Sequence, residues 1–528
     1  MQVVPVALAN RVRHLVLFAL SLPGHPSMIP KRSIVDYVAE HARRAPGRAA
    51  LHYQDRVVDY GRLEEASARC RGALAELGVQ PGERVALLMH DSPEMVVALL
   101  AIMGMGAVAV PCNPLQPVEG LTYVLQHSGT VLVIASDELV PLAQSAGAAR
   151  IVSAPGELDA MLQLATPAPL AAFDAATPCL LMYTSGSTGH PKGVVHRHGD
   201  LPFSVEHVAR DVHGLQPEDR LFSVARLFFA YGLGNSFTVP LGAGASSILL
   251  GERPTAALIA SVFEKYRPTV FFAVPTAFRM LLEHVRQGNR LDTAALRFAV
   301  SAGEVLPLAT WNEWKSVTGT EILESIGTTE MLYAFIHNRP GRNRPGSSGE
   351  VVGGYEAQLL DDAGKAVPGE GRGSLVVRGG SATPGYWNDP ERTAEAIRDG
   401  WVRTGDVYRR DADGYYWFEG RSDDLFKCSG MWVSPGEVEA AVVAHPAVVE
   451  AAVIAESDAQ GGTIPAAYVL LRPGQAAGDR LAAEIMARAA EALPRFKRPQ
   501  RIHFMDQLPR TPTGKVQRYK LRELSRRR

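Results

Sequence analysis

Residues 269–304, TVFFAVPTAFRMLLEHVRQGNRLDTAALRFAVSAGE, decide the fold class. The apolar run 269–275 has the length of a buried strand, residues 276–288 have helical spacing, and a second strand-like run follows at 296–304. Short buried strands that alternate with helices are typical of a parallel sheet covered on both faces, and ligands of such sheets bind at the carboxyl ends of the strands. Other apolar runs in this alternation are 84–89, 107–112, 131–136 and 246–251.

The pattern changes after about Gly346. Residues 349–379 alternate polar and apolar positions with Gly and Asp-Asp turns, which predicts antiparallel strands and a small barrel-like region. A compact α+β pattern follows GRSDDLFKCSG (420–430). We therefore predict an α/β protein with a large N-terminal domain of stacked mixed sheets and covering helices, residues 28–422. A small α+β C-terminal domain, residues 423–528, begins at Asp423.

The first 27 residues contain a short apolar run, 15–22, after Arg11 and Arg13. This run imitates a secretory signal, and it is shorter than the roughly 20 residues that span a bilayer. A signal, a loosely attached helix and an upstream extension are the three alternatives. We favour an extension outside the core, because the sequence from Met28 has the pattern of the start of a folded domain, with Ser33 as a helix N-cap.

The composition of the 528 residues is that of an ordinary globular protein, with 46% hydrophobic and 21% charged residues. The formal net charge of −1 does not indicate a basic surface that would bind nucleic acid or an anionic membrane. We therefore expect a small-molecule partner. Four scattered cysteines without metal-like spacing predict reduced core thiols in a cytoplasmic protein. The oligomeric state stays open, with a homodimer among the alternatives.

A Gly-rich loop, YTSGSTGHPKGVVH (183–196), follows the apolar strand CLLMY. It fails the P-loop pattern, because the sixth position from Gly186 is Pro191 and Gly193 follows Lys192. A mobile surface turn is the alternative to a phosphate cradle, but it would not need so many donors beside a buried strand. Glycines that permit close approach, hydroxyl donors and a cation favour phosphate binding by Thr184, Ser185, Gly186, Ser187, Thr188, Gly189 and Lys192.

The loop resembles the phosphate loop of the adenylate-forming superfamily, which includes acyl-CoA synthetases, luciferases and the adenylation domains of peptide synthetases. Four further segments resemble family motifs in the same order, from about Ile34 to the C-terminus. They are SIGTTE (325–330), DGWVRTGD (399–406), FEGRSDDLFKCSG (418–430) and PRTPTGKVQR (509–518). Five motifs in order are far more specific than any one of them. The resemblance implies that ATP, Mg²⁺ and CoA are used.

The resemblance also assigns residues to the ATP chemistry. Lys515 would contact the substrate carboxylate and the α-phosphate, the alternative being a solvated tail lysine. Glu330 would bind Mg²⁺ and Thr329 would support the α-phosphate, while Asp406 would bind the ribose hydroxyls and Arg421 the ribose or phosphates. The adenine and acyl sites would be lined by Ala302, Gly303, Glu304, Ile326, Gly327 and Thr328. The family often has an aromatic residue in place of Ile326, so stacking on adenine would be weaker here.

A mobile C-terminal domain is the second implication of the resemblance. Asp423 would be the hinge about which this domain rotates between two half-reactions. Lys515 would serve adenylation, and the opposite face would line the tunnel for the CoA thiol. Lys427, Gly430 and Trp432 are the candidate CoA-binding residues. Closure of this kind excludes water from a reactive intermediate.

The segment RLFFAYGLGNSFTVPLGAGASSILL (226–250) resembles the acid-binding stretch of benzoate–CoA ligases, as do 325–332, 338–356 and 430–439. A strand and turn in the core would be the structural alternative. The candidate acid-binding residues are Phe229, Ala230, Tyr231, Gly232, Tyr333 and Ala334. We expect a histidine and a larger aliphatic residue in place of Tyr333 and Ala334 in a benzoate enzyme. The acid is therefore predicted to be benzoate or a substituted benzoate, and the two differences favour a small ring substituent, such as amino or hydroxyl, or an acid otherwise larger than benzoate.

The resulting prediction is an ATP-dependent ligase that activates an aromatic carboxylate as acyl-AMP and transfers it to CoA. One alternative is a stand-alone adenylating enzyme that loads a carrier-protein thiol, since the acceptor does not change the adenylation residues. A non-catalytic nucleotide-binding relative is an alternative of another class. Intact Lys515, Glu330, Asp406 and Arg421 argue against it.

Overall fold

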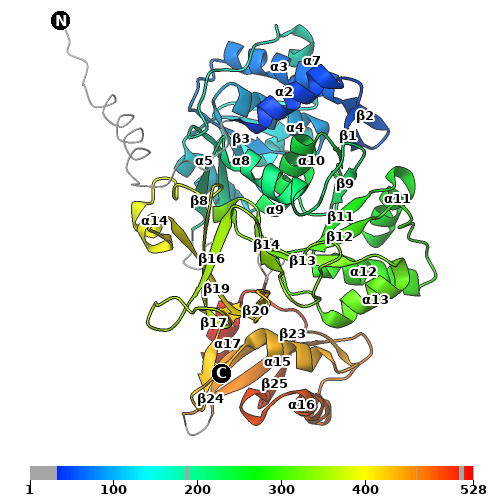
Figure 1. The fold of residues 1–528 in the computed structure, drawn as a ribbon, viewed down its shortest axis with the longest axis vertical. Coiled ribbons are helices and arrows are strands. Elements are labelled where there is room, and N and C mark those ends of the chain that lie inside the picture. The colour runs from blue at the N-terminus through cyan, green and yellow to red at the C-terminus, as the bar shows by residue number, and fades with distance from the viewer. Residues whose placement is uncertain (1–31, 185–189, 459–460, 511–515, 527–528) are drawn as a thin grey trace, which may run out of the picture. The chain divides into compact units, whose positions relative to one another are not determined.

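The structure, a computed structural model, describes residues 32–184, 190–458, 461–510 and 516–526 (Figure 1). The chain forms two compact units. The first comprises residues 1–357 and 377–402, and the second comprises residues 358–376 and 403–528. The boundary predicted at Asp423 lies within the second unit, and the domains 28–422 and 423–528 stay a prediction. The predicted extension at residues 1–27 lies outside the described residues.

A nine-stranded sheet forms one layer of the first unit, in the order β15-β14-β13-β12-β11-β9-β10-β1-β2. Neighbours from β13 to β1 are parallel, whereas β2, β14 and β15 pair antiparallel. The strands are β1 (Ala49–Tyr53), β2 (Arg56–Asp59), β9 (Arg220–Ser223), β10 (Ser246–Ile248), β11 (Val270–Ala273), β12 (Phe298–Ser301), β13 (Ile322–Gly327), β14 (Ala334–His337) and β15 (Glu350–Val351).

Residues 269–304 form β11, α12 (Pro275–Arg286) and β12, as predicted, and the two strands are parallel neighbours in this sheet. Helix α12 lies beside α11 (Ala256–Tyr266) and α13 (Leu308–Thr318) near β11 to β13 (Figure 1). Their apolar faces join one core cluster that includes Phe271, Phe278 and Trp314. The rings of Phe278 and Trp314 meet edge to face at 5.0 Å, a preferred aromatic geometry. This packing fixes the position of the carboxyl end of β12.

A six-stranded sheet of order β6-β5-β3-β4-β7-β8 forms the other layer. It is parallel except for the antiparallel pair β7–β8, so the predicted stacked mixed sheets are confirmed. The strands are β3 (Arg84–Leu88), β4 (Val108–Pro111), β5 (Thr130–Ser136), β6 (Ile151–Ala154), β7 (Pro178–Thr184) and β8 (Lys192–Arg197). The helices of this part are α2 (Ile34–Arg44), α3 (Tyr60–Glu76), α4 (Pro93–Gly104), α5 (Val118–Ser128), η2 (Asp137–Leu139), α6 (Val140–Ser145) and α7 (Gly156–Leu164).

One detail of this layer matches a sequence prediction. Ser33 is the N-cap of α2, and its backbone N–H donates to the Asp36 carboxylate at 2.8 Å. Helix α4 is a core helix, buried along its length. Across the described ranges, no helix combines the length and the apolar character needed to cross a membrane.

Two helical runs with irregular turns lie before and after β9 (Arg220–Ser223) in the chain. Their segments are α8 (Asp200–Ser204), η3 (Val205–Arg210), α9 (Ala230–Leu233), η4 (Gly234–Thr238) and α10 (Val239–Ala243), with η5 (Thr329–Met331) after β13. Segments η3 and η4 are π-helical, a geometry that is often found at functional sites. Sequence periodicity did not predict these wide turns.

A third sheet has the order β16-β17-β19-β18, with β20 paired to β19. Strands β18–β19 and β19–β20 are antiparallel, as predicted for this region. The two compact units divide within β16, β17 and β19. The elements are β16 (Tyr355–Leu360), β17 (Gly371–Gly379), α14 (Pro390–Ala396), β18 (Ile397–Arg398), β19 (Trp401–Arg410) and β20 (Tyr416–Arg421).

The end of the chain has the predicted α+β form. A hairpin of β21 (Phe426–Cys428) and β22 (Met431–Val433) precedes the three-stranded sheet β23-β24-β25. One core joins the helices to this sheet through Val438, Val453 and Ile485. The remaining elements are α15 (Pro435–Val443), β23 (Val448–Ser457), β24 (Thr463–Leu471), α16 (Asp479–Ala492), η6 (Arg495–Lys497), β25 (Arg501–Phe504) and α17 (Arg518–Arg526).

The four cysteines are buried and form no disulfide, as predicted. Burial raises the pKa of Cys70 and of Cys112 to about 12. These thiols therefore stay protonated at neutral pH and act as small core residues rather than as nucleophiles.

Candidate active site

The Gly-rich loop connects β7 to β8 at the end of the six-stranded sheet. Thr184 is the last residue of β7 and faces Lys192, the first residue of β8, across the hairpin. The hairpin therefore holds both ends of the predicted phosphate loop at adjacent positions. The predicted contacts Ser185, Gly186, Ser187, Thr188 and Gly189 lie outside the described residues.

Lys192 and Glu330 form an ion pair that brings two predicted site residues together. The Lys192 ammonium donates to Glu330 Oε1 at 2.8 Å, although 138 positions separate the two residues. Burial alone would raise the pKa of the Glu330 carboxyl, but the charge of Lys192 and hydrogen bonds from Lys192 and Tyr386 outweigh it, so this pKa lies below its ordinary value. Glu330 is therefore an anion at neutral pH.

Tyr386 completes this cluster and was not predicted from the sequence. Its hydroxyl accepts from Lys192 Nζ at 2.6 Å and donates to Glu330 Oε1 at 2.8 Å. The Lys192 ammonium also lies 4.3 Å from the centre of the Tyr386 ring, within cation–π range. The segment around Tyr386, TPGYWND (383–389), has the composition of an ordinary turn, and no local sequence pattern connects Tyr386 to Lys192 or Glu330.

Residues 328–330 begin a turn whose backbone is fixed by a second unpredicted residue. His196 on β8 lies with Nε2 2.7 Å from the Thr329 carbonyl, and its Nδ1 faces the Asp200 carboxylate. The predicted α-phosphate contact Thr329 is thus tied to the strand that also carries Lys192.

Two hydroxyls near the predicted nucleotide contacts have no partner within the described part of the chain. They are Thr328 Oγ1 and Ser301 Oγ, and both are buried. Ser301 ends β12 and is followed by Ala302, Gly303 and Glu304, with Gly303 in the left-handed region at φ +87°. Buried polar atoms without partners are costly, so these hydroxyls fit a site that a polar ligand completes.

The candidate acid-binding residues lie on α9 and around β14. The Tyr231 hydroxyl donates to the Val300 carbonyl at 3.1 Å, which places Tyr231 near the carboxyl end of β12. A Cβ at Gly232 would lie 1.9 Å from the Arg226 carbonyl oxygen, so only glycine fits there. Phe229 precedes α9, and its ring contacts that of Phe228 at 4.1 Å between centroids.

Tyr333 is fully buried, and its hydroxyl is already bonded. It donates to Asn235 Oδ1 at 2.5 Å, and the Asn235 amide donates to Ser223 Oγ at 3.2 Å. The Tyr333 ring packs against Gly234, where an added Cβ would lie 2.2 Å from two ring carbons. The hydroxyl keeps acceptor capacity, while its proton is held by the π-helical turn η4. Ala334 follows as the first residue of β14 and is buried.

In the second unit, Asp406 and Arg421 are cross-strand partners on β19 and β20. Arg421 Nη1 donates to Asp406 Oδ1 at 3.0 Å and to the Thr404 carbonyl at 3.1 Å. Gly405 has φ +74°, and a Cβ there would lie 2.8 Å from the Arg421 guanidinium. The strand pairing thus brings together the two residues assigned to the ribose.

The predicted CoA residues lie on and beside the β21–β22 hairpin. Lys427 and Trp432 are paired in the hairpin register, and Lys427 Nζ lies 4.6 Å from the indole centre. Gly430 makes the turn at φ +78°. Asp423 precedes the hairpin, and Lys515 lies outside the described residues.

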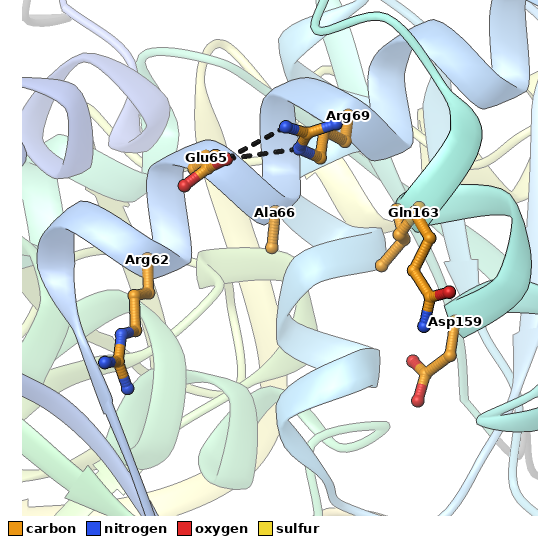
Figure 2. A pocket seen from close by; sticks show the side chains of 7 residues that line it. Arg62, Glu65, Ala66, Arg69, Asp159 and Gln163 are labelled. Atoms are coloured by element: carbon orange, nitrogen blue, oxygen red, sulfur yellow. Dashed lines mark hydrogen bonds and ion pairs between the residues drawn. The ribbon is translucent and has the colours of Figure 1, made fainter.

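A groove between α3 and α7 contains none of the predicted site residues (Figure 2). Glu65 and Arg69 on α3 form an ion pair at 3.1 Å, while Asp159 and Gln163 point into the groove from α7. Exposed pairs of this kind contribute little, and this groove has no buried polar group for catalysis.

Within the described ranges, no group of three or more His, Cys, Asp or Glu side chains could hold a metal ion. A single ionised carboxylate, Glu330, is nevertheless the hard oxygen donor that Mg²⁺ takes when substrate phosphates and water supply the other ligands. The Lys192 ammonium already occupies a cation position beside Glu330 Oε1. The residues present therefore fit a phosphate-bound Mg²⁺.

Family comparisons cover most of the chain. The AMP-binding enzyme family matches residues 38–387, and the AMP-binding enzyme C-terminal domain matches residues 437–515. The benzoate–CoA ligase of Thauera aromatica is 37% identical over 96% of this chain and 100% of its own length. The 4-hydroxybenzoate–CoA/benzoate–CoA ligase of Rhodopseudomonas palustris is 38% identical over 93% of this chain and 94% of its own.

A solved structure shows the same fold. The anthranilate CoA ligase AuaEII in complex with anthranoyl-AMP superposes with a TM-score of 0.88 at 36% identity, covering 95% of this chain and 98% of that one. The resemblance stated from the motifs is therefore confirmed over nearly the whole length. This chain belongs to the AMP-binding enzyme family.

Proposed function

We propose that this chain is an ATP-dependent aryl-CoA ligase. It activates an aromatic carboxylate as an aryl-adenylate and transfers the aryl group to the thiol of CoA. The observation that carries this proposal is the partly buried Lys192–Glu330–Tyr386 cluster at the end of the phosphate-loop hairpin. The relatives that match this chain over nearly their full length are aryl-CoA ligases.

In the first half-reaction, a carboxylate oxygen of the acid attacks the α-phosphorus of ATP. The new acyl–phosphate bond forms as the bond to the bridging oxygen breaks, and pyrophosphate leaves with that electron pair. Two anions must approach, so cationic groups aimed at the reacting oxygens lower the barrier. We assign Lys515 to the carboxylate and α-phosphate, and Thr329 to the α-phosphate.

The leaving group is bound by the phosphate loop and its surroundings. Lys192 binds a β- or γ-phosphate oxygen as a point charge, and Glu330 holds the Mg²⁺ that neutralises the phosphates when bound. Loop residues Thr184 to Gly189 supply hydroxyl and backbone donors. The buried Thr328 hydroxyl, which lacks a partner within the described residues, adds a donor near the same turn.

A further group of residues is assigned to the nucleoside half of ATP. Asp406 accepts hydrogen bonds from the ribose hydroxyls, and Arg421 orients Asp406 through its bond at 3.0 Å. The backbone of Ala302 to Glu304, with Ile326 and Gly327, lines the adenine and acyl positions. Because Ile326 is aliphatic, it packs against adenine without aromatic stacking.

In the second half-reaction, the CoA thiolate attacks the adenylate carbonyl, forming the thioester and releasing AMP. We propose that the chain from Asp423 onward rotates between the two half-reactions, which makes 28–422 and 423–528 the functional domains. Lys427, Gly430 and Trp432 then approach the pantetheine arm. The left-handed turn at Gly430 leaves its backbone open to a narrow ligand.

The acid is a benzoate that carries a small polar ring substituent. The assigned pocket is formed by Phe229, Ala230, Tyr231, Gly232, Tyr333 and Ala334. The Tyr333 proton is held by Asn235, so its hydroxyl presents an acceptor, which suits a donor such as an amino or hydroxyl group. Relatives of this chain are named as ligases of benzoate, 4-hydroxybenzoate and anthranilate, which belong to this size class.

Pyrophosphate release from ATP should therefore be fastest with a substituted benzoate. We expect 2-aminobenzoate or a hydroxybenzoate to exceed benzoate by about tenfold in kcat/KM, the effect of one well-placed hydrogen bond. A coupled pyrophosphate assay with benzoate, 2-aminobenzoate, the three hydroxybenzoates and straight-chain acids makes the comparison. A strong preference for unsubstituted benzoate would show that Tyr333 does not read a substituent, and turnover of alkyl acids alone would rule out an aryl ligase.

The sequence also predicts a cytoplasmic enzyme and leaves a homodimer open. We retain both as parts of this proposal. Light scattering behind size-exclusion chromatography measures the oligomeric state directly, and a monomeric mass would remove the homodimer.

A further inference from the structure

Tyr386 stands at the centre of the ion pair on which ATP binding depends. Its side chain is 7% exposed, and its one hydroxyl oxygen bonds to both partners of the pair. Lys192, Glu330 and Tyr386 lie in the same compact unit, on β8, on η5 and before α14. The cluster is therefore a property of one rigidly packed unit.

The proton positions in this cluster follow from its donors and acceptors. The ammonium donates to Glu330 Oε1 and to the phenol oxygen, so the phenol O–H is left to donate to Glu330 Oε1. Burial, and next the charge of Glu330, raise the pKa of the Tyr386 hydroxyl, which keeps this proton in place. Across the described part of the chain, no side chain donates to Glu330 Oε2.

The backbone around Tyr386 is tied to both partners. Tyr386 forms a β-bridge with Val194, two residues after Lys192, and the next residue, Trp387, donates its N–H to the Gly193 carbonyl at 2.7 Å. The Thr383 N–H donates to the Glu330 carbonyl at 2.8 Å. The segment 383–387 thus bridges the strand that carries Lys192 and the turn that carries Glu330.

ATP with Mg²⁺ cannot bind without changing this cluster. Glu330 Oε1 already accepts two donors, and the Lys192 ammonium is committed to Glu330 rather than to a phosphate. When Lys192 turns to a phosphate, Glu330 loses the Lys192 ammonium, and its remaining partners would be the Tyr386 hydroxyl and the Mg²⁺ assigned to this carboxylate. Tyr386 is the only other described side chain that already donates to this carboxylate.

We propose that Tyr386 is a positioning residue for ATP, an inference that rests on the proposed function. Its ring packs against the Lys192 ammonium, and its hydroxyl stays on Glu330 Oε1 as Lys192 turns to a phosphate. Glu330 Oε2 would then be the oxygen available to Mg²⁺. Tyr386 therefore acts through Lys192 and Glu330 and contributes to the binding of MgATP rather than to the transfer to CoA.

Tyr386→Phe tests this role, because it removes the hydroxyl and keeps the ring. We expect the KM for MgATP in pyrophosphate release to rise about tenfold, the loss of one hydrogen bond to a charged group. The Mg²⁺ concentration needed at fixed ATP should rise, while the KM for the acid is unchanged. Conversion of chemically prepared aryl-AMP and CoA to the thioester should keep the wild-type rate.

Tyr60→Phe is the matched control. Tyr60 is a fully buried tyrosine on α3 whose hydroxyl donates to the Ala245 carbonyl at 2.8 Å, away from the cluster. This variant removes a buried hydroxyl from the same unit and should leave the KM for MgATP unchanged.

A second comparison uses Lys192→Met. If Tyr386 acts through Lys192, adding Tyr386→Phe to Lys192→Met should change the KM for MgATP less than threefold.

Two results would overturn the role of Tyr386. The first is a Tyr386→Phe enzyme with wild-type KM for MgATP and wild-type Mg²⁺ dependence. The second is an equal loss in both half-reactions together with a lowered melting temperature, which would show a structural role. Failure of the proposed function looks different, because the wild-type chain itself would then form no aryl-adenylate from any acid.

Discussion

Replacing Lys515 by alanine is expected to lower the rate of aryl-adenylate formation by about 10²- to 10³-fold, as for the loss of one preorganised charge at a transition state. Lys515 is the cation assigned to the two anions that must meet, and Glu330 would hold the Mg²⁺ that supplies further positive charge to the phosphates. Pyrophosphate release measures the loss. Equilibrium dialysis with labelled ATP should show that ATP still binds, because Lys515 contacts the reacting groups and not the nucleoside.

A second lysine in the same C-terminal segment provides the control. Lys520 is exposed on α17, five residues after Lys515, and its replacement by alanine should leave pyrophosphate release within about twofold of wild type. Thioester formation from prepared aryl-AMP should also survive Lys515→Ala. Normal pyrophosphate release by Lys515→Ala would remove the assigned mechanism of the first half-reaction.

Glu330→Gln is expected to lower adenylation about 10²-fold and to raise the Mg²⁺ concentration needed for half-maximal rate. The change keeps the side-chain shape but removes the anion whose pKa lies below its ordinary value next to Lys192. Because that pKa is lowered, the wild-type carboxylate stays ionised through neutral pH, so the difference between the two enzymes should persist from pH 6 to pH 8. Magnesium titrations at fixed ATP measure it.

Glu324→Gln is the control for this substitution. Glu324 is a buried carboxyl on β13 that accepts from the Gly346 N–H at 2.7 Å, and burial raises its pKa to about 7. A glutamine accepts the Gly346 hydrogen bond, and the second contact of this carboxyl, from the Leu306 N–H at 3.4 Å, is long and weak. Adenylation and its Mg²⁺ dependence should therefore be close to wild type. Glu330→Gln with unchanged Mg²⁺ dependence would contradict the assignment of Glu330 to the metal.

The sequence predicts the layers of this fold because strand and helix signals are local. The runs at 84–89 and 269–275 contain enough adjacent apolar residues to identify buried strands, and the structure places them in β3 and β11. The π-helical turn η4 was not predicted, because its extra residue per turn comes from packing around Asn235 and Tyr333. Local periodicity contains no information on such contacts.

The same distinction applies to the candidate site, where local motifs were predicted and contacts between distant residues were not. Motifs identify Lys192 and Glu330, since each stands in a patterned segment, and the structure brings them within 2.8 Å. Tyr386 and His196 were missed because their importance comes from partners more than 50 and more than 130 positions away. Tyr333 was predicted to offer a polar group, but only the structure shows that its proton is already held by Asn235.

Mass spectrometry of the products formed from ATP, an aromatic acid and CoA decides whether this chain is an aryl-CoA ligase. Without CoA, the wild-type chain should form aryl-AMP and pyrophosphate. On addition of CoA, the aryl-AMP should disappear in step with the appearance of aryl-CoA and AMP. Hydrolysis of ATP to ADP, or an aryl-AMP that persists in the presence of CoA and is consumed only by a carrier-protein thiol, would contradict an aryl-CoA ligase.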